Sequence, residues 1–171
     1  RVAAILNVEH DHPDCYPDLD AVMEVFSAFA SRVSGDGVLV VNGEDRNVSR
    51  AVGEVAAATE TFGIEGGDFP WRADDLQWFR GRCRFGLVYG GRLLGHAQLK
   101  LPGRHNVMNA LAAAALAYHC GADVDAILRA MATFGGVGRR MEFKGVSRGI
   151  SVIDDYAHHP TEIQASLRTI L

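Results

Sequence analysis

Short apolar runs alternate with amphipathic helical patterns along the first third of this chain. Residues 2–8 and 37–45 are short and apolar, and each ends at charged or turn-forming residues, which is typical of buried strands. Residues 19–33 and 48–55 instead repeat apolar side chains at helical spacing, and Asp18 precedes the first of these segments at the capping position. Strand, helix, strand, helix is the order of a parallel sheet with helices packed on it.

The middle of the chain changes to short β-prone pieces that are separated by glycines. Gly90 and Gly91 lie between two such pieces, which predicts a hairpin turn. We expect residues 56–101 to form a small antiparallel sheet, inserted in the parallel sheet or leaning on it. Residues 103–121 and 122–136 then predict two further helices, of which the first is rich in alanine and ends at Gly121.

The last residues predict the beginning of another α/β unit. Residues 149–155 have the pattern of a buried strand, and a polar loop leads from them to a helix that begins at Pro160 and reaches Leu171. Because this unit begins with nothing to pair against, we expect the chain to be a piece of a longer protein. The predicted fold class is therefore α/β, with a mostly parallel sheet flanked by helices, a small antiparallel sheet, and the first strand and helix of a further domain.

Charge and composition argue against several kinds of partner. The net charge of −4 provides no electrostatic reason to expect nucleic acid or an anionic membrane. The longest apolar run, residues 110–118, is far shorter than the roughly 20 residues that cross a bilayer. The three cysteines are widely separated and form no CxxC pair, which is typical of a reducing compartment. We expect a cytoplasmic protein that neither binds nucleic acid nor inserts into a membrane.

Acidic residues and histidines crowd the loop after the first strand. This loop lies at the carboxyl end of the predicted parallel sheet, where open α/β folds bind their ligands. Oxygen and imidazole ligands suit Mg²⁺ or Mn²⁺, with phosphate oxygens completing the coordination. The alternative is a solvated acidic loop, and the spacing alone does not separate the two interpretations. The residues concerned are Glu9, His10, Asp11, His12 and Asp14.

The alanine-rich helix begins with His105, Asn106 and Asn109, which places polar groups one turn apart at its amino end. An asparagine amide offers both a donor and an acceptor, so this pair could bind the edge of a purine. The alternative is that Asn106 only caps the helix.

Two more polar segments follow near the end of the chain. Arg139 and Arg140 lie in a glycine-rich turn and could bind phosphate or ribose, although paired arginines in a loop are more often solvated. Asp155, His158 and His159 lie between the last strand and the last helix, where a helix start could bind a phosphate. The alternative is an ordinary capped turn.

The order of these motifs resembles that of the Mur ligases, the ATP-dependent amide-forming enzymes of peptidoglycan assembly. The segments that carry the resemblance are "NVEHDHPDCYP", "LPGRHNVMNALAAAALA", "FGGVGRRMEFKG" and "VIDDYAHHPTEI". The first and last look most like the branch that adds L-alanine, so the resemblance implies UDP-N-acetylmuramate and L-alanine as substrates.

The resemblance also implies a domain organisation. Residues 1–144 would form the second half of the central ATP-binding domain, and residues 145–171 would open the Rossmann-like carboxy-terminal domain. The family's phosphate loop, a GKT or GKS turn, does not occur in this sequence. The resemblance therefore implies that the amino-terminal and the remaining carboxy-terminal parts of the same enzyme are missing partners of this chain.

Carried over position by position, the resemblance implies ATP and Mg²⁺ (or Mn²⁺) as cofactors. His12 would bind the second metal ion. Asn106 and Asn109 would contact the adenine, with Asn109 the main contact. Arg140 would contact the ribose or the phosphates, and Asp155 would contact the ribose.

His158 and His159 would face the acyl phosphate and the incoming amino acid, and are the implied catalytic residues. ATP would phosphorylate a carboxylate, and the amine of L-alanine would then displace the phosphate. The isolated chain would be inactive. Two alternatives remain at this stage: a murein tripeptide ligase of cell-wall recycling, and a non-catalytic remnant that binds nucleotide or nothing.

Overall fold

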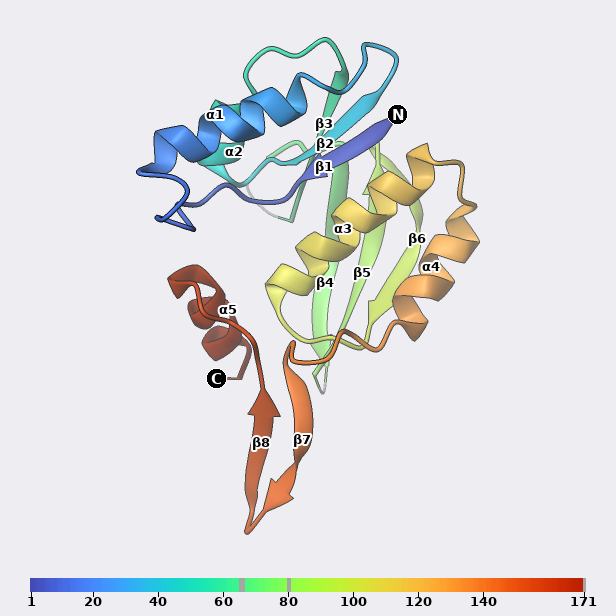
Figure 1. Ribbon diagram of the computed structural model, residues 1–171. Helices are drawn as coiled ribbons and strands as arrows, with labels where there is room; N and C mark the ends of the chain where they lie inside the picture. Colours follow the sequence, from blue (N-terminus) through green and yellow to red (C-terminus); the bar gives the residue numbers. More distant parts are fainter. Residues whose placement is uncertain (65–66, 80, 171) are drawn as a thin grey trace.

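The computed structural model describes residues 1–64, 67–79 and 81–170 and contains one continuous six-stranded sheet. The strands lie side by side in chain order (Figure 1). The first three neighbouring pairs are parallel and the last two are antiparallel. The strands are β1 (Val2–Ile5), β2 (Val38–Asn42), β3 (Ala58–Gly63), β4 (Trp71–Phe79), β5 (Arg82–Tyr89) and β6 (Arg92–Leu99).

The antiparallel strands extend the parallel ones in the same sheet. Trp71, the first residue of β4, pairs with Phe62 of the parallel β3 on one side and with Tyr89 of the antiparallel β5 on the other. Trp71 is completely buried, so the change of strand direction occurs at a residue fixed in the core. This confirms an α/β fold with a mostly parallel sheet and shows how its antiparallel part is attached.

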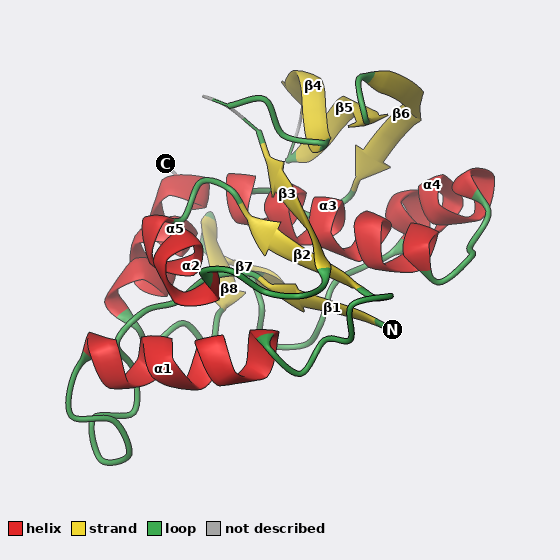
Figure 2. Ribbon diagram, turned by 90° about the horizontal axis from the view of Figure 1, so that it is seen from above, coloured by secondary structure: helices red, strands yellow, loops and turns green. Residues whose placement is uncertain are grey.

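Helices cover both faces of the sheet (Figure 2). Two of them, α1 (Leu19–Ala30) and α2 (Arg46–Val52), pack on one face, while α3 (Arg104–His119) and α4 (Val124–Thr133) pack on the other. Asp18 caps α1 as predicted, since its carboxylate accepts a hydrogen bond from the Ala21 N–H at 2.9 Å. None of the described helices is long and apolar enough to cross a membrane.

Each face of the sheet has its own apolar core. Leu39 and Val41 of β2 face α1 and α2, whereas Val40 between them faces α3. This alternation follows from the two-residue repeat of a strand. The central strands are thus buried on both faces, which explains their continuous apolar sequence.

A separate hairpin and one helix complete the described chain. The strands β7 (Glu142–Ser147) and β8 (Ile150–Asp154) pair only with each other and project from the body, and α5 (Pro160–Ile170) follows them (Figure 1). The prediction of a buried strand here is wrong: Ile150 and Val152 are 68% and 48% exposed, because within the described chain no second layer covers β8. The predicted domain boundary at residues 144 and 145 falls inside β7 and stays a prediction, and Leu171 lies outside the described residues.

Candidate functional site

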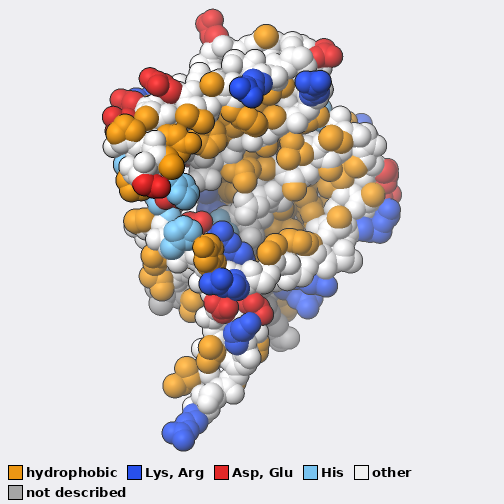
Figure 3. Space-filling view, in the orientation of Figure 1, with side chains coloured by type: hydrophobic (Ala, Val, Ile, Leu, Met, Phe, Trp, Pro, Cys, Tyr) orange, Lys and Arg blue, Asp and Glu red, His pale blue; other side chains and the backbone are white. Residues whose placement is uncertain are grey.

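A broad groove of about 1840 Å³ opens beside the carboxyl end of β2, between α3 and α5. Figure 3 shows this face of the molecule, with histidine side chains gathered beside a hollow. All four residues predicted to contact the nucleotide line this groove, although they come from three separate segments of the chain: Asn106, Asn109, Arg140 and Asp155.

Asn106 does not cap α3, which excludes the simpler alternative for this residue. The N-cap position is Gly103, and no side chain makes the capping hydrogen bond there. The Asn106 amide nitrogen instead donates to the Pro102 carbonyl oxygen at 2.6 Å, which ties the first turn of α3 to the loop before it. Asn109 lies one turn further along and is exposed in the groove.

Asp155 ties three segments together at the edge of the groove. Its carboxylate accepts hydrogen bonds from the Ala157 N–H at 2.7 Å, the Met141 N–H at 3.0 Å and the Ser166 hydroxyl at 3.1 Å. Burial alone would raise the pKa of Asp155, but these hydrogen bonds, together with the nearby charge of Arg140, lower it below its ordinary value. Asp155 is therefore an ionised group with a fixed orientation.

Arg140 lies on the turn that Asp155 holds. Its guanidinium is 3.4 Å from the Glu162 carboxylate of α5 and 6.0 Å from the centre of the Tyr156 ring. Half of its side chain remains exposed, so a phosphate or ribose in the groove could compete for the guanidinium.

His105 is a groove residue that the motif-based assignment omits. Burial lowers the pKa of His105, and while the carboxylate of Asp155 opposes this shift, the charge of Arg140 adds to it. The lowered pKa favours the neutral imidazole at pH 7. His105 lines the groove, and its charge state responds to Asp155 and Arg140, two of the predicted nucleotide contacts. The sequence indicates this position, because His105 directly precedes Asn106 in the first turn of α3.

A smaller cavity of about 370 Å³ lies between the β1–α1 loop, α1 and the start of α5. His12 lines it with a left-handed backbone (φ 54°) and a side chain that is 70% exposed. A left-handed non-glycine residue is uncommon. The hydrogen bond from the His12 N–H at 2.8 Å lowers the pKa of Asp11 below its ordinary value.

The predicted metal site is incomplete within the described residues. These residues contain no group of three His, Cys, Asp or Glu side chains placed to bind one metal ion. The exposed imidazole of His12 lies 3.8 Å from the neighbouring Asp11 carboxylate. This donor set fits Mg²⁺ or Mn²⁺ only if phosphate oxygens or other groups supply the remaining ligands.

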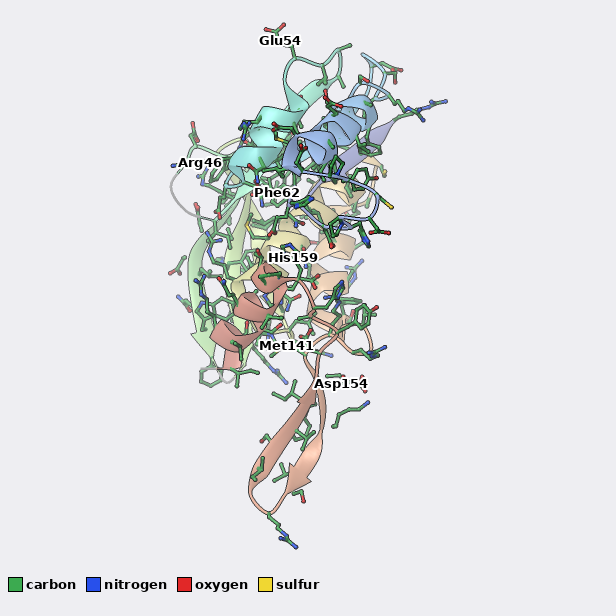
Figure 4. The ribbon with its side chains drawn as sticks, turned by 60° about the vertical axis from the view of Figure 1, so that its left-hand side comes forward. Arg46, Glu54, Phe62, Met141, Asp154 and His159 are labelled. Carbon is green, nitrogen blue, oxygen red and sulfur yellow. The ribbon has the colours of Figure 1, made fainter. Side chains whose placement is uncertain are left out.

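The two adjacent histidines face different surroundings. His159 points to the β1–α1 loop, with Nδ1 3.3 Å from the Glu9 carboxylate and Nε2 3.3 Å from the His10 carbonyl oxygen. Figure 4 shows His159 at the start of α5, beside this loop. His158 turns back on its own segment, with Nδ1 3.0 Å from the Tyr156 carbonyl oxygen. The structure therefore brings His159, but not the His158 ring, into contact with the predicted metal loop.

Two family models match the chain in sequence order. The model described as Mur ligase middle domain matches residues 1–117, and the model described as Mur ligase, glutamate ligase domain, matches residues 139–171. The chain belongs to the Mur ligase family. Both matched segments line the groove of this Mur ligase. Asn106 and Asn109 belong to the first segment, and Arg140 and Asp155 belong to the second.

Sequence relatives of this Mur ligase chain are longer enzymes. The UDP-N-acetylmuramate–L-alanine ligase of Caldanaerobacter subterraneus subsp. tengcongensis is 40% identical over 168 residues, which are 97% of this chain and 36% of that enzyme. The ligase of the same name from Solibacter usitatus is 41% identical over 166 residues, or 97% of this chain and 35% of the relative. The chain thus spans about a third of the relatives that it matches.

Solved Mur ligase structures share the fold over nearly the whole chain. MurF from Acinetobacter baumannii matches with a TM-score of 0.83 at 25% identity, covering 98% of this chain and 36% of that one. UDP-N-acetylmuramate-alanine ligase MurC from Thermotoga maritima matches with a TM-score of 0.77 at 30% identity, covering 99% and 37%. A murein peptide ligase from Psychrobacter arcticus 273-4 matches with a TM-score of 0.73 at 28% identity, covering 98% and 34%.

Proposed function

We propose that this chain is part of a UDP-N-acetylmuramate–L-alanine ligase and supplies one side of its ATP site. The observation that carries the proposal is the identity of about 40% to ligases of that name over 97% of the chain. The convergence of Asn106, Asn109, Arg140 and Asp155 on one groove supports it independently. We place residues 1–144 in the central ATP-binding domain and residues 145–171 in the carboxy-terminal domain, as the resemblance predicts.

In this proposal the groove binds ATP. The amide of Asn109 is exposed at the first turns of α3 and contacts the adenine edge, while Asn106 contributes the part of its amide that does not bind Pro102. Arg140 neutralises phosphate charge or contacts the ribose, and the ionised Asp155 accepts hydrogen bonds from the ribose hydroxyls. The neutral His105 lies beside them as a further contact.

His12 and phosphate oxygens would together bind Mg²⁺ or Mn²⁺ in the middle of the β1–α1 loop. The metal ion, when bound, stabilises the negative charge that develops on the transferred phosphoryl group. In the reaction, the carboxylate of UDP-N-acetylmuramate attacks the γ-phosphorus of ATP and releases ADP. The amine of L-alanine then attacks the acyl carbon, so that an amide forms and phosphate leaves.

His158 and His159 are proposed to act in this second step. An attacking ammonium group must lose a proton before its nitrogen is a nucleophile, and an imidazole is suited to accept it near neutral pH. His159 is the better placed of the two, since its ring faces the loop that carries His12. Because its substrates include ATP and a UDP-sugar, we propose that the enzyme works in the cytoplasm.

The test is a coupled assay for ADP release, performed on the protein encoded by the complete open reading frame that contains these residues. We expect ADP release that requires both UDP-N-acetylmuramate and L-alanine. Release that requires the murein tripeptide instead of L-alanine would favour the second candidate, a murein peptide ligase, for which the structural match at 28% identity provides support. If no amino acid or peptide elicits ADP release, the ligase proposal is wrong.

The same assay applies to the isolated 171-residue chain, which we expect to be inactive because its sequence has no GKT or GKS loop. Titration calorimetry with Mg-ATP addresses the remaining alternative, a nucleotide-binding remnant. ATP binding by the isolated chain, combined with an inactive complete protein, would favour that remnant.

A further inference from the structure

A polar contact joins the two segments that match different domain families. Glu9 belongs to the first matched segment, and Thr161 and His159 belong to the second. The Thr161 hydroxyl donates a hydrogen bond to Glu9 Oε2, and His159 Nδ1 lies 3.3 Å from the same oxygen. His159 Nε2 also lies 3.3 Å from the His10 carbonyl oxygen. One loop therefore contacts both His159 and Thr161, the residues on either side of Pro160 at the start of α5.

This contact is partly shielded from water. The side chains of Glu9 and His159 are 27% and 20% exposed, so water has limited access to the atoms that join them. A hydrogen bond from a hydroxyl to an ionised carboxylate is also among the stronger kinds in proteins. The contact is thus able to influence where α5 lies.

Glu9 is itself fixed from the side of the sheet. The Asn7 amide nitrogen donates to Glu9 Oε1 at 3.2 Å. The preceding residue, Val8, is fully buried, and its N–H and carbonyl oxygen bind Asp45 Oδ2 at 3.1 Å and Asn47 Nδ2 at 2.9 Å. The backbone that carries Glu9 is therefore attached to the start of α2, and the carboxylate has a defined position.

We infer that Glu9 is a positioning residue that sets the start of α5, and with it His159, against the edge of the sheet. This inference deepens the proposed function and rests on it where it assigns His159 a part in the reaction. Both Glu9 oxygens accept hydrogen bonds from the protein, Oε1 from the Asn7 amide and Oε2 from the Thr161 hydroxyl. Because Oε2 binds the first turn of α5, Glu9 acts through the position of that helix.

The test replaces Thr161, which leaves Glu9 and His159 chemically unchanged. In the protein from the complete open reading frame, Thr161→Val keeps the side-chain shape and removes the hydroxyl, and Thr161→Ser keeps the hydroxyl. Thr133→Val is the matched control, because the hydrogen bonds of the Thr133 hydroxyl among the described residues go to carbonyl oxygens of its own helix, at 2.8 and 3.2 Å. We expect Thr161→Val to lower kcat about tenfold, with KM values for ATP and L-alanine within about twofold of the parent.

We expect Thr161→Ser to restore kcat to nearly the parent value, and Thr133→Val to leave it unchanged. A Thr161→Val enzyme with the parent kcat, or a Thr161→Ser enzyme as slow as Thr161→Val, would overturn the inference. A loss of kcat matched by an equal loss of folded protein at the assay temperature would also overturn it, because the effect would then be structural alone.

Hydrogen exchange separates this inference from the proposed function. Thr161→Val should speed amide exchange in the first turn of α5 and in residues 9–12, relative to the parent and to Thr133→Val, and leave β2 and β3 unchanged. If the parent has no ligase activity, the proposed function fails while this measurement still applies. Unchanged exchange in the first turn of α5 would show that Glu9 does not position the helix.

Discussion

At the scale of single residues, several carboxylates of this chain hold separate backbone segments together. Asp45 accepts hydrogen bonds from the Asn47 and Val48 N–H groups with Oδ1, which caps α2, and from the Val8 N–H with Oδ2. Asp155 similarly joins the arginine turn, its own loop and α5. The sequence does not reveal that Asp45 reaches Val8 or that Asp155 reaches Met141 and Ser166, because these contacts are between distant segments.

Asn47→Asp should destabilise the protein by about 1–3 kcal/mol. The substitution preserves the shape of the side chain but replaces the amide donor with a carboxylate oxygen, which would face the Val8 carbonyl oxygen. Urea unfolding measures the difference. Ser49→Ala is the matched control in the same helix, since the hydrogen bond of the Ser49 hydroxyl among the described residues is a long one to the Asp45 carbonyl oxygen, at 3.4 Å. Equal stability of the two variants would refute the role assigned to Asn47.

Asp155 should make stability depend on pH in the acid range. Its pKa in the folded state is below the ordinary value of 3.8, so the fold favours the ionised form. This contribution is present above about pH 4 and is lost as the pH falls through the folded pKa. We expect Asp155→Asn to be less stable than the parent at pH 7 by about 1–2 kcal/mol, and the difference to shrink below about pH 4.

The measurement is urea unfolding at a series of pH values. Asp154→Asn is the matched control, because it removes the same charge from the adjacent position. A parent and an Asp155→Asn variant with parallel curves would contradict this prediction.

At the scale of elements, apolar periodicity located the helices but overestimated their length. The pattern predicted a helix over residues 19–33, whereas α1 ends at Ala30. Val33 extends the pattern because it is buried in the core from the turn beyond the helix. Periodicity reports which side chains are buried, and burial continues after the helical backbone has ended.

The strands also depend on a polar network that their pattern does not reveal. Glu60 of β3 accepts hydrogen bonds from Trp71 Nε1 at 2.7 Å and the Tyr89 hydroxyl at 2.8 Å, and lies 2.8 Å from His119 Nε2. One carboxylate thereby connects β3, β4, β5 and the end of α3. Burial would raise the pKa of Glu60, but the hydrogen bonds from His119, Tyr89 and Trp71 lower it overall.

Glu60→Gln should weaken this network, because an amide has one acceptor oxygen where the carboxylate has two. We expect the free energy of unfolding to fall by about 1–3 kcal/mol. Burial and the Glu60 carboxylate raise the pKa of Tyr89 to about 12, and removal of the charge should lower it. Tyrosinate absorbance follows this pKa, and Glu54→Gln, at an exposed position, is the control. An unchanged Tyr89 pKa would show that burial alone raises it.

At the scale of the whole molecule, the exposed hairpin is the feature that most distinguishes this chain from a self-contained domain. Large apolar side chains lie exposed along β7 and β8, and these are Phe143, Val146, Ile150, Val152 and Ile153. Exposed apolar patches of this kind mark surfaces that bind other protein surfaces or associate with one another. The body of the molecule, by contrast, has a covered core on each face of its sheet.

We therefore expect the isolated 171-residue chain to self-associate through the hairpin. The double substitution Val146→Lys and Ile150→Lys should shift sedimentation toward the monomer, because charged side chains cost free energy when buried in a new interface. Leu93→Lys is the control, since Leu93 is 51% exposed on β6. If the isolated chain sediments as a monomer at all concentrations, the hairpin does not drive association.

The sequence by itself determined the local structure and the family of this protein. Strand and helix patterns arise from contacts close in the chain, and the motifs around Asn106, Arg140 and Asp155 are continuous segments, so both can be recognised without coordinates. The tertiary structure alone decided which side chains meet. It brought the nucleotide-binding candidates to one groove, turned His159 but not the His158 ring toward Glu9, and left β8 exposed. These outcomes depend on packing between residues up to 152 positions apart, and no local pattern contains that information.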